Sequence, residues 1–578
     1  MKNTSLQDMN IANGNIVIPK RMKGETNDSP AIRRAIDAVR ETGGTVYFCD
    51  SKYYISEPII IYRDVCYVGR GAGQTTIYVE IGANCDAFKT YNFDMYVNQA
   101  LYGESVDENF GPKSTLPQNF VVRGMTIDCG ANFEETEIPH TFRCTGNTKG
   151  YGFKIFGKRY VTSEIQVQNV PEVGYYSEFN SGEVVTVSNS FNYFIGSRIS
   201  VRVISSGEEG FIYRGPSDQR IDDLWICSSC LTNKTTVFAD REDWELAAVV
   251  FDDRDAKYGS VPYCASPELG FAHVWRGFNC WGIVVCGYAR FKADHLIIES
   301  TNGGFKNSNF SYSQISILDV HDCRFGDNTR PYIWLRSKTH TKISNLEIRF
   351  SRETSNKDMV RIDGDNVIIS ECLLRGDADL IGLENAGGHG VIINGNFNQV
   401  LGLHGMHVEG KGTDGAPAAA VVLNGSRNVV RGIAHDCTAG AIVNNGDNTL
   451  DLTVSRVSER GATSVIINAQ NKELLRLGLN DFDRTTKERA YYPATLTDEN
   501  AISLDTDEVQ NIAIAHHLPF IPSAHDVVPV IIGAADENFS IAYLSVVGCD
   551  HENVYLSVKL DKTADSNKKI GLAVNIGK

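Results

Sequence analysis

Three closely spaced aspartates, Asp252, Asp253 and Asp255, form the most suggestive acidic group in the chain. Two carboxyl groups can split a glycosidic bond, because one protonates the leaving oxygen while the other activates water or attacks the sugar. A second acidic group consists of Glu208 and Glu209, which stand between two glycines. These five residues are therefore our candidate catalytic acids.

Elimination is the alternative way to break such a bond. It needs a base beside the carboxylate of a uronic acid. Four residues of this stretch have suitable side chains: Lys257, Tyr258, His273 and Arg276. Nothing in the sequence ranks them, so hydrolysis and elimination both stay open.

Aromatic and acidic side chains are concentrated between Ser228 and Gly282, where three of the five tryptophans lie. Aromatic rings stack on sugar rings and carboxylates accept hydrogen bonds from hydroxyls, so this mixture predicts a glycan groove. The alternative is a satellite hydrophobic core beneath a long loop. The residues that we expect to contact a substrate are Trp244, Tyr258, Trp275, Arg276 and Trp281, together with Asp322 and Asp327 from a later corner.

The first element that can position these residues is a helix near the N-terminus. Asp28 and Ser29 are its candidate capping residues, and Pro30 fits its first turn. Gly43 and Gly44 end it. Its apolar side chains form one stripe at helical spacing, made of Ile32, Ala35, Ile36 and Val39.

Short strand-forming segments separated by tight polar turns recur through the middle of the chain. The residue that opens each second strand gives the period: Asn119, Arg159, Asn192, Arg220, Arg290, Gln314, Lys342, Asn366, Asn398, Asn428 and Asn448. Nearly all steps are 20 to 40 residues long, which is typical of a solenoid whose units bury their apolar faces against their neighbours. Because the units are strands, we predict an all-β chain built as a parallel β-helix.

One step in this series, between Arg220 and Arg290, is 70 residues long. It predicts an insertion at 228–282 that leaves the solenoid on one side. Loops on a rigid scaffold commonly carry binding and catalytic residues. Glu208 and Glu209 occupy the corner of the preceding coil, so we expect them to face the aspartates of the insertion across a groove.

The beginning of the chain resembles the pectate-lyase-like right-handed β-helix superfamily, and in particular its branch of bacteriophage tailspikes. The resemblance covers residues 16–80 and rests on the segments 27–38, Gly43–Phe48 and Val68–Ile77. It departs from the family at Cys49–Tyr54, where a Pro-x-Gly-x-Tyr turn is usual. The resemblance implies a right-handed β-helix that acts on bacterial surface polysaccharide. It carries no catalytic residue.

Composition excludes several classes of partner. The net charge of −16 argues against nucleic acid, whose phosphates need a basic face. No run of about 18 apolar residues is present, so no membrane span is predicted. Met1–Asn15 lacks the apolar segment of a signal peptide, so none is expected.

No metal ion or cofactor is predicted. Cys227 and Cys230 have no second pair at the spacing of a zinc site. His516, His517 and His525 match no ligand pattern either. Phosphate-binding and dinucleotide-binding motifs are missing as well.

After the last coil, the pattern changes to separate alternating strands, which predicts a small C-terminal β-sandwich. The segment His516–Val527 resembles a terminal module of phage tail proteins, which implies trimerisation or glycan contact. The predicted domains are an N-terminal tail at 1–15, a cap at 16–100, a β-helix at 101–478, a connector at 479–500 and a sandwich module at 501–578.

These observations lead to one expected function with two alternatives. We expect a tailspike depolymerase that is made in the host cytoplasm, belongs to the virion tail and cleaves capsule, exopolysaccharide or O-antigen outside the cell. Endo-acting hydrolysis is preferred to lyase chemistry, and a non-catalytic receptor-binding spike is the other alternative. Its expected partners are the polysaccharide, two further copies in a homotrimer and other tail proteins.

Overall fold

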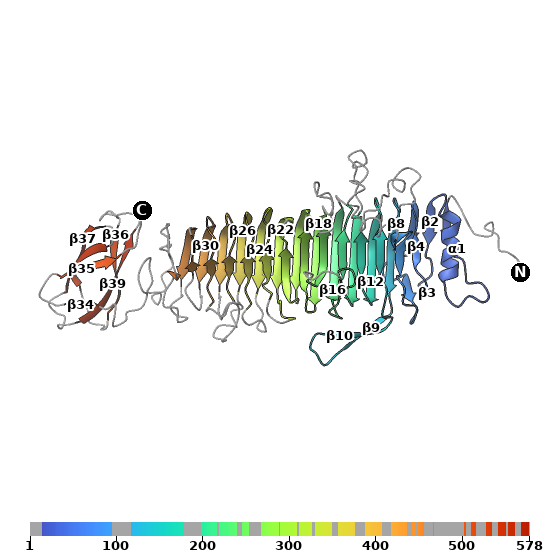
Figure 1. Cartoon of the computed structure of the whole chain (residues 1–578), viewed down its shortest axis with the longest axis horizontal. Coiled ribbons are helices and arrows are strands. Elements are labelled where there is room, and N and C mark those ends of the chain that lie inside the picture. The colour runs from blue at the N-terminus through green and yellow to red at the C-terminus, as the bar shows by residue number, and fades with distance from the viewer. Residues whose placement is uncertain are drawn as a thin grey trace. The chain divides into compact units, whose positions relative to one another are not determined.

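A computed structural model gives the structure of the chain (Figure 1). It describes residues 14–94, 97, 117–178, 198–216, 219–239, 245–253, 267–287, 290–308, 311–325, 330–349, 357–375, 388–406, 418–435, 442–446, 448–455, 466–467, 502–504, 510–515, 527–534, 541–550, 553–560 and 568–576. The chain divides into two compact units, Met1–Leu346 and Glu347–Lys578.

The first unit contains a sheet of mostly long parallel strands, which we call the long-strand sheet. Its strands in chain order are β1 (Asn15–Val17), β2 (Gly44–Tyr47), β3 (Lys52–Ile55), β5 (Val65–Val68), β6 (Thr76–Val79), β8 (Val121–Asp128), β12 (Val161–Val170), β14 (Arg198–Ser206), β16 (Arg220–Ser229), β18 (Glu268–Gly277), β20 (Arg290–Glu299) and β22 (Tyr312–His321), and β24 (His340–Arg349) begins in this unit. Each strand pairs with strands of the neighbouring coils, as a solenoid requires.

A second parallel sheet of shorter strands, the short-strand sheet, forms another wall of the same unit. It contains β4 (Ile59–Ile61), β7 (Phe88–Thr90), β11 (Phe153–Phe156), β13 (Tyr175–Glu178), β15 (Phe211–Arg214), β17 (Ala247–Asp253), β19 (Trp281–Gly287), β21 (Gly303–Asn307) and β23 (Ile333–Leu335). One antiparallel hairpin, β9 (Ala131–Glu135) and β10 (Phe142–Gly146), extends from the coils. The two stacked parallel sheets confirm the predicted right-handed parallel β-helix.

Apolar and aromatic side chains fill the space between the sheets. Phe88, Phe153, Tyr175 and Phe211 occupy matching positions in four successive coils of the short-strand sheet. Their ring centroids are 5.1, 5.2 and 5.3 Å apart, so they form a continuous internal stack. All four side chains are fully buried. The interior is therefore a packed core.

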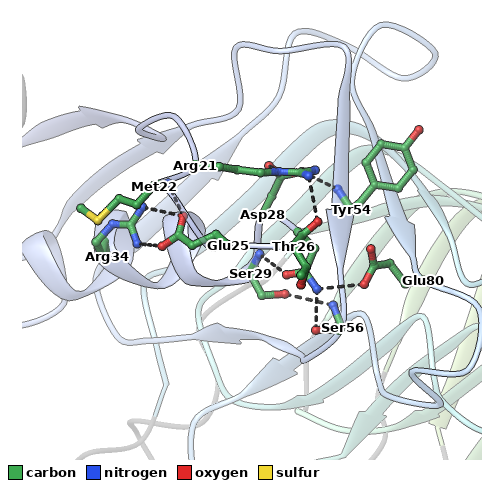
Figure 2. A network of polar contacts seen from close by, with 11 residues as sticks. Arg21, Met22, Glu25, Thr26, Asp28, Ser29, Arg34, Tyr54, Ser56 and Glu80 are labelled. Carbon is green, nitrogen blue, oxygen red and sulfur yellow. Dashed lines mark hydrogen bonds and ion pairs between the residues drawn. The ribbon is translucent and has the colours of Figure 1, made fainter.

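The helix α1 (Ser29–Val39) begins where the sequence predicts, although it is capped differently. Asp28 is the N-cap residue, but its side chain makes no capping hydrogen bond. Its carboxylate instead accepts hydrogen bonds from Arg21 at 2.6 and 2.8 Å and from the Tyr54 amide at 2.7 Å (Figure 2). The Asn27 side chain accepts from the Ser29 amide at 3.1 Å. Asp28 thus occupies the predicted cap position, but its carboxylate ties the helix to β3 and makes no capping hydrogen bond.

The predicted insertion contains part of the solenoid itself. Within 228–282, β17 pairs with β15 in the short-strand sheet and β18 pairs with β16 in the long-strand sheet. The 70-residue step therefore spans an additional coil. Periodicity did not reveal this coil, because Pro267 and Glu268 stand at its turn in place of the Asn, Gln, Arg or Lys found in the other coils.

The second unit has parallel strands of both kinds. Its long strands are β26 (Val367–Arg375), β28 (Gln399–Met406), β30 (Val429–His435) and β32 (Thr449–Ser455), and its short strands are β25 (Val360–Ile362), β27 (Val391–Ile393), β29 (Val421–Leu423), β31 (Ile442–Asn444) and β33 (Ile466–Ile467). Three predicted turn residues, Asn398, Asn428 and Asn448, are buried. The Asn428 side chain accepts from the Asn398 amide at 2.9 Å, and that of Asn448 accepts from the Asn428 amide at 3.0 Å.

The C-terminal segment forms two antiparallel sheets of three strands. One contains β34 (Ile502–Leu504), β36 (Val527–Ala534) and β39 (Lys568–Ile576), and the other contains β35 (Gln510–Ala515), β37 (Ile541–Cys549) and β38 (Asn553–Leu560). The sandwich and the other domain boundaries stay predictions. In the described ranges, no helix is long and apolar enough to cross a membrane.

Candidate functional site

Four neighbouring strands of the long-strand sheet, β16, β18, β20 and β22, present one partly exposed surface that we call the outer face. Successive residues of a strand point to opposite sides. Apolar residues of these strands point into the core, while the alternate positions carry aromatic, imidazole and carboxylate groups. The outer face carries Trp225 of β16; Phe271, His273 and Trp275 of β18; His295 and Glu299 of β20; and Asp319 and His321 of β22.

Pairing between the strands aligns these side chains in rows across the coils. One row runs through Trp225, His273, Ile297 and Asp319. The next row, two residues further along each strand, runs through Cys227, Trp275, Glu299 and His321. Neighbouring strands lie about 4.8 Å apart. Residues that are 22 to 48 positions apart in the sequence thus become direct neighbours.

Imidazole and carboxylate groups meet in a repeated diagonal arrangement. His273 Nε2 lies 3.1 Å from Glu299 Oε1, and His295 Nε2 lies 3.2 Å from Asp319 Oδ2. In each pair the acid belongs to the next coil and stands two residues beyond the residue opposite the histidine. His321 Nδ1 lies 3.4 Å from the other oxygen of Glu299. These five side chains are 19% to 36% exposed, so they are held in place and still reachable.

Aromatic side chains line the same surface. Trp225 lies with its ring centroid 5.5 Å from Phe271 and 5.0 Å from His273. Its indole nitrogen donates to Asp223 at 2.7 Å, which fixes the orientation of the ring. Trp275 is 43% exposed beside Glu299. Large exposed aromatic rings next to hydrogen-bonding acids suit the apolar faces and hydroxyls of sugars.

A polar recess of about 180 Å³ lies at the beginning of the same strands. Charged residues of both signs line it, among them Arg220, Glu268, Lys292 and Asp294. Lys292 pairs with Glu268 at 3.2 Å. The recess therefore has no strong excess of either charge, and it extends the outer face toward the start of the strands.

Glu299 and Asp319 are two neighbouring acids of the outer face. They lie on adjacent strands and are offset by two residues, which puts their Cα atoms roughly 8 Å apart. Glycosidases hold their two carboxyl groups about 6.5–9.5 Å apart for inversion and about 5–5.5 Å apart for retention, and side chains on Cα atoms at this separation can reach either distance. The imidazole groups beside them supply proton-transfer partners for either hydrolysis or elimination.

The predicted acid Asp252 lies elsewhere, in a buried ionic cluster on the short-strand sheet. Arg214 lies between two carboxylates, 3.0 Å from Glu178 and 3.4 Å from Asp252. Tyr176 donates to Glu178 at 2.7 Å, and the Cys286 thiol lies 3.2 Å from Asp252. Glu178 and Asp252 are fully buried. Asp253 ends β17 with its side chain outside the described part, and Asp255 lies outside the described residues.

The other two predicted acids, Glu208 and Glu209, are also buried. Glu208 accepts hydrogen bonds at 2.8 Å from both the amide and the hydroxyl of Thr236, and it thereby anchors the following loop. Burial raises the pKa of Glu208 to about 7, although these hydrogen bonds act in the opposite direction. The structure does not bring Glu208 to the outer face. The catalytic role of all five sequence-predicted acids stays a prediction.

The raised pKa of Glu208 gives a testable pH dependence. Between pH 4.5 and 7 the unfolded chain ionises this carboxyl while the folded chain keeps it protonated, so the folded state loses stability as the pH rises. Glu208→Gln removes this loss. We expect the variant to gain about 2–3 kcal/mol relative to the wild type between pH 4.5 and 8, measured by urea unfolding. Parallel pH profiles would contradict the assignment, and the exposed Glu134→Gln serves as control.

The sequence-predicted binding residues take different positions. Trp275 lies on the outer face, and Arg276 follows it, exposed at the corner. Asp322 follows His321 and pairs with Arg324 at 3.1 Å. Trp281 is fully buried and donates to Glu245 at 2.8 Å. Four other candidate residues lie outside the described part of the chain: Trp244, Lys257, Tyr258 and Asp327. The same is true of three histidines that were not expected to bind a metal ion, His516, His517 and His525.

The aromatic residues between Ser228 and Gly282 are divided between a buried cluster and the surface. Trp281 belongs to a satellite core on the outside of the short-strand sheet, with Phe238 and Val250 among its members. Trp275, only six residues earlier, is exposed on the outer face. Within the described residues, no group of three or more His, Cys, Asp or Glu has an arrangement that suits a metal ion.

Four residues of the outer face were not among those predicted from the sequence: Glu299, Asp319, His295 and His321. A signal for them does exist: His295-x-Ile297-x-Glu299 and Ile317-x-Asp319-x-His321 place polar groups at alternate positions of two strands 22 residues apart. Alternation identifies outward-facing residues. It does not show which of these residues come into contact, and the undetected coil at β18 hid the pairing of His273 with Glu299.

A family model described as rhamnogalacturonase A/epimerase, pectate lyase-like, matches residues 21–135. This match confirms the resemblance expected for the beginning of the chain, and it ends before the outer face. A comparison with curated proteins finds no match.

Several solved structures are similar to the chain. The tailspike protein of E. coli bacteriophage HK620, in complex with pentasaccharide, is 11% identical, with 96% of this chain and 93% of that chain covered and a TM-score of 0.50. The mannuronan C-5 epimerase AlgE4 A-module of Azotobacter vinelandii is 13% identical, with coverages of 80% and 96% and a TM-score of 0.33. ORF18 of Geobacillus virus E2 is 14% identical, with coverages of 96% and 78% and a TM-score of 0.26. At such identities the likeness to the tailspike concerns the fold, which agrees with the expected β-helix.

Proposed function

We propose that the chain is a phage tailspike depolymerase that binds bacterial surface polysaccharide and cleaves its glycosidic bonds. The observation that carries this proposal is the pair Glu299 and Asp319 on one partly exposed face, each beside an imidazole, with Trp275 next to Glu299. The tailspike-like fold supports the proposed lineage. Capsule, exopolysaccharide and O-antigen are the substrate classes to test.

In the proposed hydrolysis the two carboxyl groups have separate roles. Glu299, which has imidazoles on both of its oxygens, acts as the base that activates water. Asp319 acts as the acid that protonates the leaving oxygen, and His295 holds it in position. Trp225 and Trp275 hold the neighbouring sugars. The Cα separation of roughly 8 Å is compatible with inversion and with retention of configuration.

Lyase chemistry is the second candidate, and the imidazole–carboxylate pairs favour it. A histidine oriented by a carboxylate is a general base of the usual form. In this mechanism His273, oriented by Glu299, removes the proton next to the carboxylate of a uronic acid. His273 is also one of the bases that the sequence analysis named for elimination. A third candidate is a spike that binds the same glycan without cleaving it.

One assay separates the three candidates. The protein is incubated with purified capsule and O-antigen, and new reducing ends and ultraviolet absorbance of unsaturated uronates are followed together. We expect reducing ends without the absorbance, which indicates hydrolysis. Reducing ends with the absorbance would identify a lyase, and binding without products would identify a receptor-binding spike. The absence of both binding and products would overturn the proposal.

The proposal also includes assembly and location. We propose a homotrimer attached to the virion tail with other tail proteins, which acts outside the host cell after synthesis in its cytoplasm. The charge of −16 remains unfavourable for nucleic-acid partners. Light scattering of the purified chain tests the trimer directly.

A further inference from the structure

A second groove lies at the N-terminal end of the long-strand sheet, and we call it the cap groove. It has a volume of about 610 Å³ and is lined by Tyr54, Tyr78, Glu80, Ile81 and Asp128, among others. Sites for small ligands are typically about 300–1,000 Å³. This groove contains none of the outer-face residues described above, so the proposed mechanism leaves it without a role.

Two stacked tyrosines form one side of the cap groove. Tyr54 of β3 and Tyr78 of β6 are direct partners in the sheet, with ring centroids 5.3 Å apart and planes at 19°. The guanidinium of Arg21 lies 6.0 Å from the Tyr54 ring. Because β6 lies between β3 and β8, the opposite face of Tyr78 is turned toward β8, where Asp128 is its partner. That face borders the groove.

Two hydrogen-bonded carboxylates stand near this tyrosine pair: Asp128 lies opposite Tyr78 on β8, and Glu80 follows β6 directly. Asp128 accepts from Gln168 at 2.9 Å, from Asn169 at 3.1 Å and from the Gly130 amide at 3.0 Å. Glu80 accepts from the Asn27 side chain at 2.8 Å. In Figure 2, which draws the polar contacts around Asp28, Glu80 and the Tyr54 ring both lie at the right of the view. Both carboxylates are thus oriented in advance and remain partly exposed.

The chemistry of the cap groove suits a sugar without negative charge. An aromatic face next to fixed carboxylates can bind a pyranose ring, whose C–H face packs on the tyrosine while its hydroxyls donate to the acids. Ile81, which is 71% exposed, adds an apolar wall. Arg21 is held by Asp28, and the two carboxylates would repel an acidic sugar.

The cap groove and the outer face belong to one row of the same sheet. From Tyr78 the paired positions pass through Asp128, Gln168, Ile204, Cys227 and Trp275 to Glu299. Every pairing in this series is parallel, so the row runs straight across six strand spacings. At about 4.8 Å each, Tyr78 and Glu299 are about 29 Å apart. An extended glycan chain can therefore touch both places.

We propose that the cap groove is a remote subsite for a neutral segment of the same polysaccharide chain that is cleaved on the outer face. This inference rests on the proposed function. A polymer held at two sites binds more tightly than a fragment held at one, because its second contact is intramolecular. The cap groove therefore affects affinity for long chains and leaves the bond-breaking step unchanged.

Tyr78→Ala tests the cap groove. We expect KM for intact polysaccharide to rise about tenfold, with kcat unchanged and with no effect on short fragments. The matched control is Tyr91→Ala, because Tyr91 stacks on Tyr62 at 5.0 Å and Arg40 lies 5.7 Å from the Tyr62 ring. That second pair follows β4 and β7 of the short-strand sheet and lies outside the row. We expect the control variant to behave as the wild type does.

Asp128→Asn provides a second variant with less risk to folding, and we expect a smaller increase of KM for the polymer alone. If the wild type cleaves the polymer and both variants have the same KM for long chains as the wild type, the subsite proposal is contradicted. The proposed function would then stand. Equal losses on long chains and short fragments would also overturn it, since that result indicates a general structural effect. A wild type that neither binds nor cleaves any polysaccharide would remove the proposed function first.

Discussion

Glu299→Gln is expected to lower kcat for polysaccharide cleavage by about 10²- to 10⁴-fold. Glu299 lies between His273 at 3.1 Å and His321 at 3.4 Å, and it is the base in the proposed hydrolysis. An amide keeps the size of the side chain but cannot take up a proton. In the lyase mechanism the same change leaves His273 without its orienting carboxylate, so a large loss is expected in both cases. Kinetics of new reducing ends measure it.

The fold is expected to tolerate this change. The Glu299 side chain is 24% exposed, and ion pairs of this kind contribute about 0–1 kcal/mol. Thermal unfolding and glycan binding should therefore remain close to those of the wild type. Glu134→Gln is the matched control, because Glu134 forms an ion pair with Arg143 in the β9–β10 hairpin and is not on the strands of the outer face. Full turnover by Glu299→Gln would contradict the role of Glu299 and leave Asp252, Asp253 and Asp255 as candidate catalytic acids.

Arg214→Met is expected to lower the free energy of unfolding by about 3–5 kcal/mol. Arg214 lies 3.0 Å from Glu178 and 3.4 Å from Asp252, and all three side chains are almost completely buried. Without the guanidinium, two negative charges remain close together in the interior, where water cannot screen them. Urea unfolding followed by tryptophan fluorescence measures the change.

Arg220→Met is the control for Arg214→Met. Arg220 forms an ion pair with Asp222 at 2.7 Å, but the two side chains are 50% and 40% exposed. Its removal should therefore cost less than about 1 kcal/mol. Equal effects of the two substitutions would contradict the role given to the buried cluster. Loss of cleavage in Asp252→Asn with unchanged stability would support the acid that the sequence analysis preferred.

The coil architecture follows from local patterns in the chain. The stripe made by Ile32, Ala35, Ile36 and Val39 predicted α1, and these residues are buried in it. Turn residues such as Asn366 and Arg159 predicted the beginning of strands, and both adopt positive φ just before β26 and β12. Both signals depend on neighbours in sequence, so one chain is enough to read them.

The candidate site depends on neighbours in space. Carboxylates crowded together in the sequence drew attention to Asp252, yet a strand buries it against Arg214. Glu299 and Asp319 are 20 residues apart and stand in no conspicuous motif. They form a pair because β20 and β22 are adjacent with Glu299 opposite His321.

Sequence patterns alone were sufficient to identify a solenoid of strands and its helical cap, because repetition and alternation are local properties. The pectate-lyase-like character of the beginning came from the resemblance of its motifs to that family. The chemistry of the outer face required the tertiary structure. Pairing between coils places His273 beside Glu299 and His295 beside Asp319, and each contact depends on loop length and register across more than 20 residues. The same pairing links the cap groove to the outer face along one row, because stacked strands repeat each position at a fixed spacing.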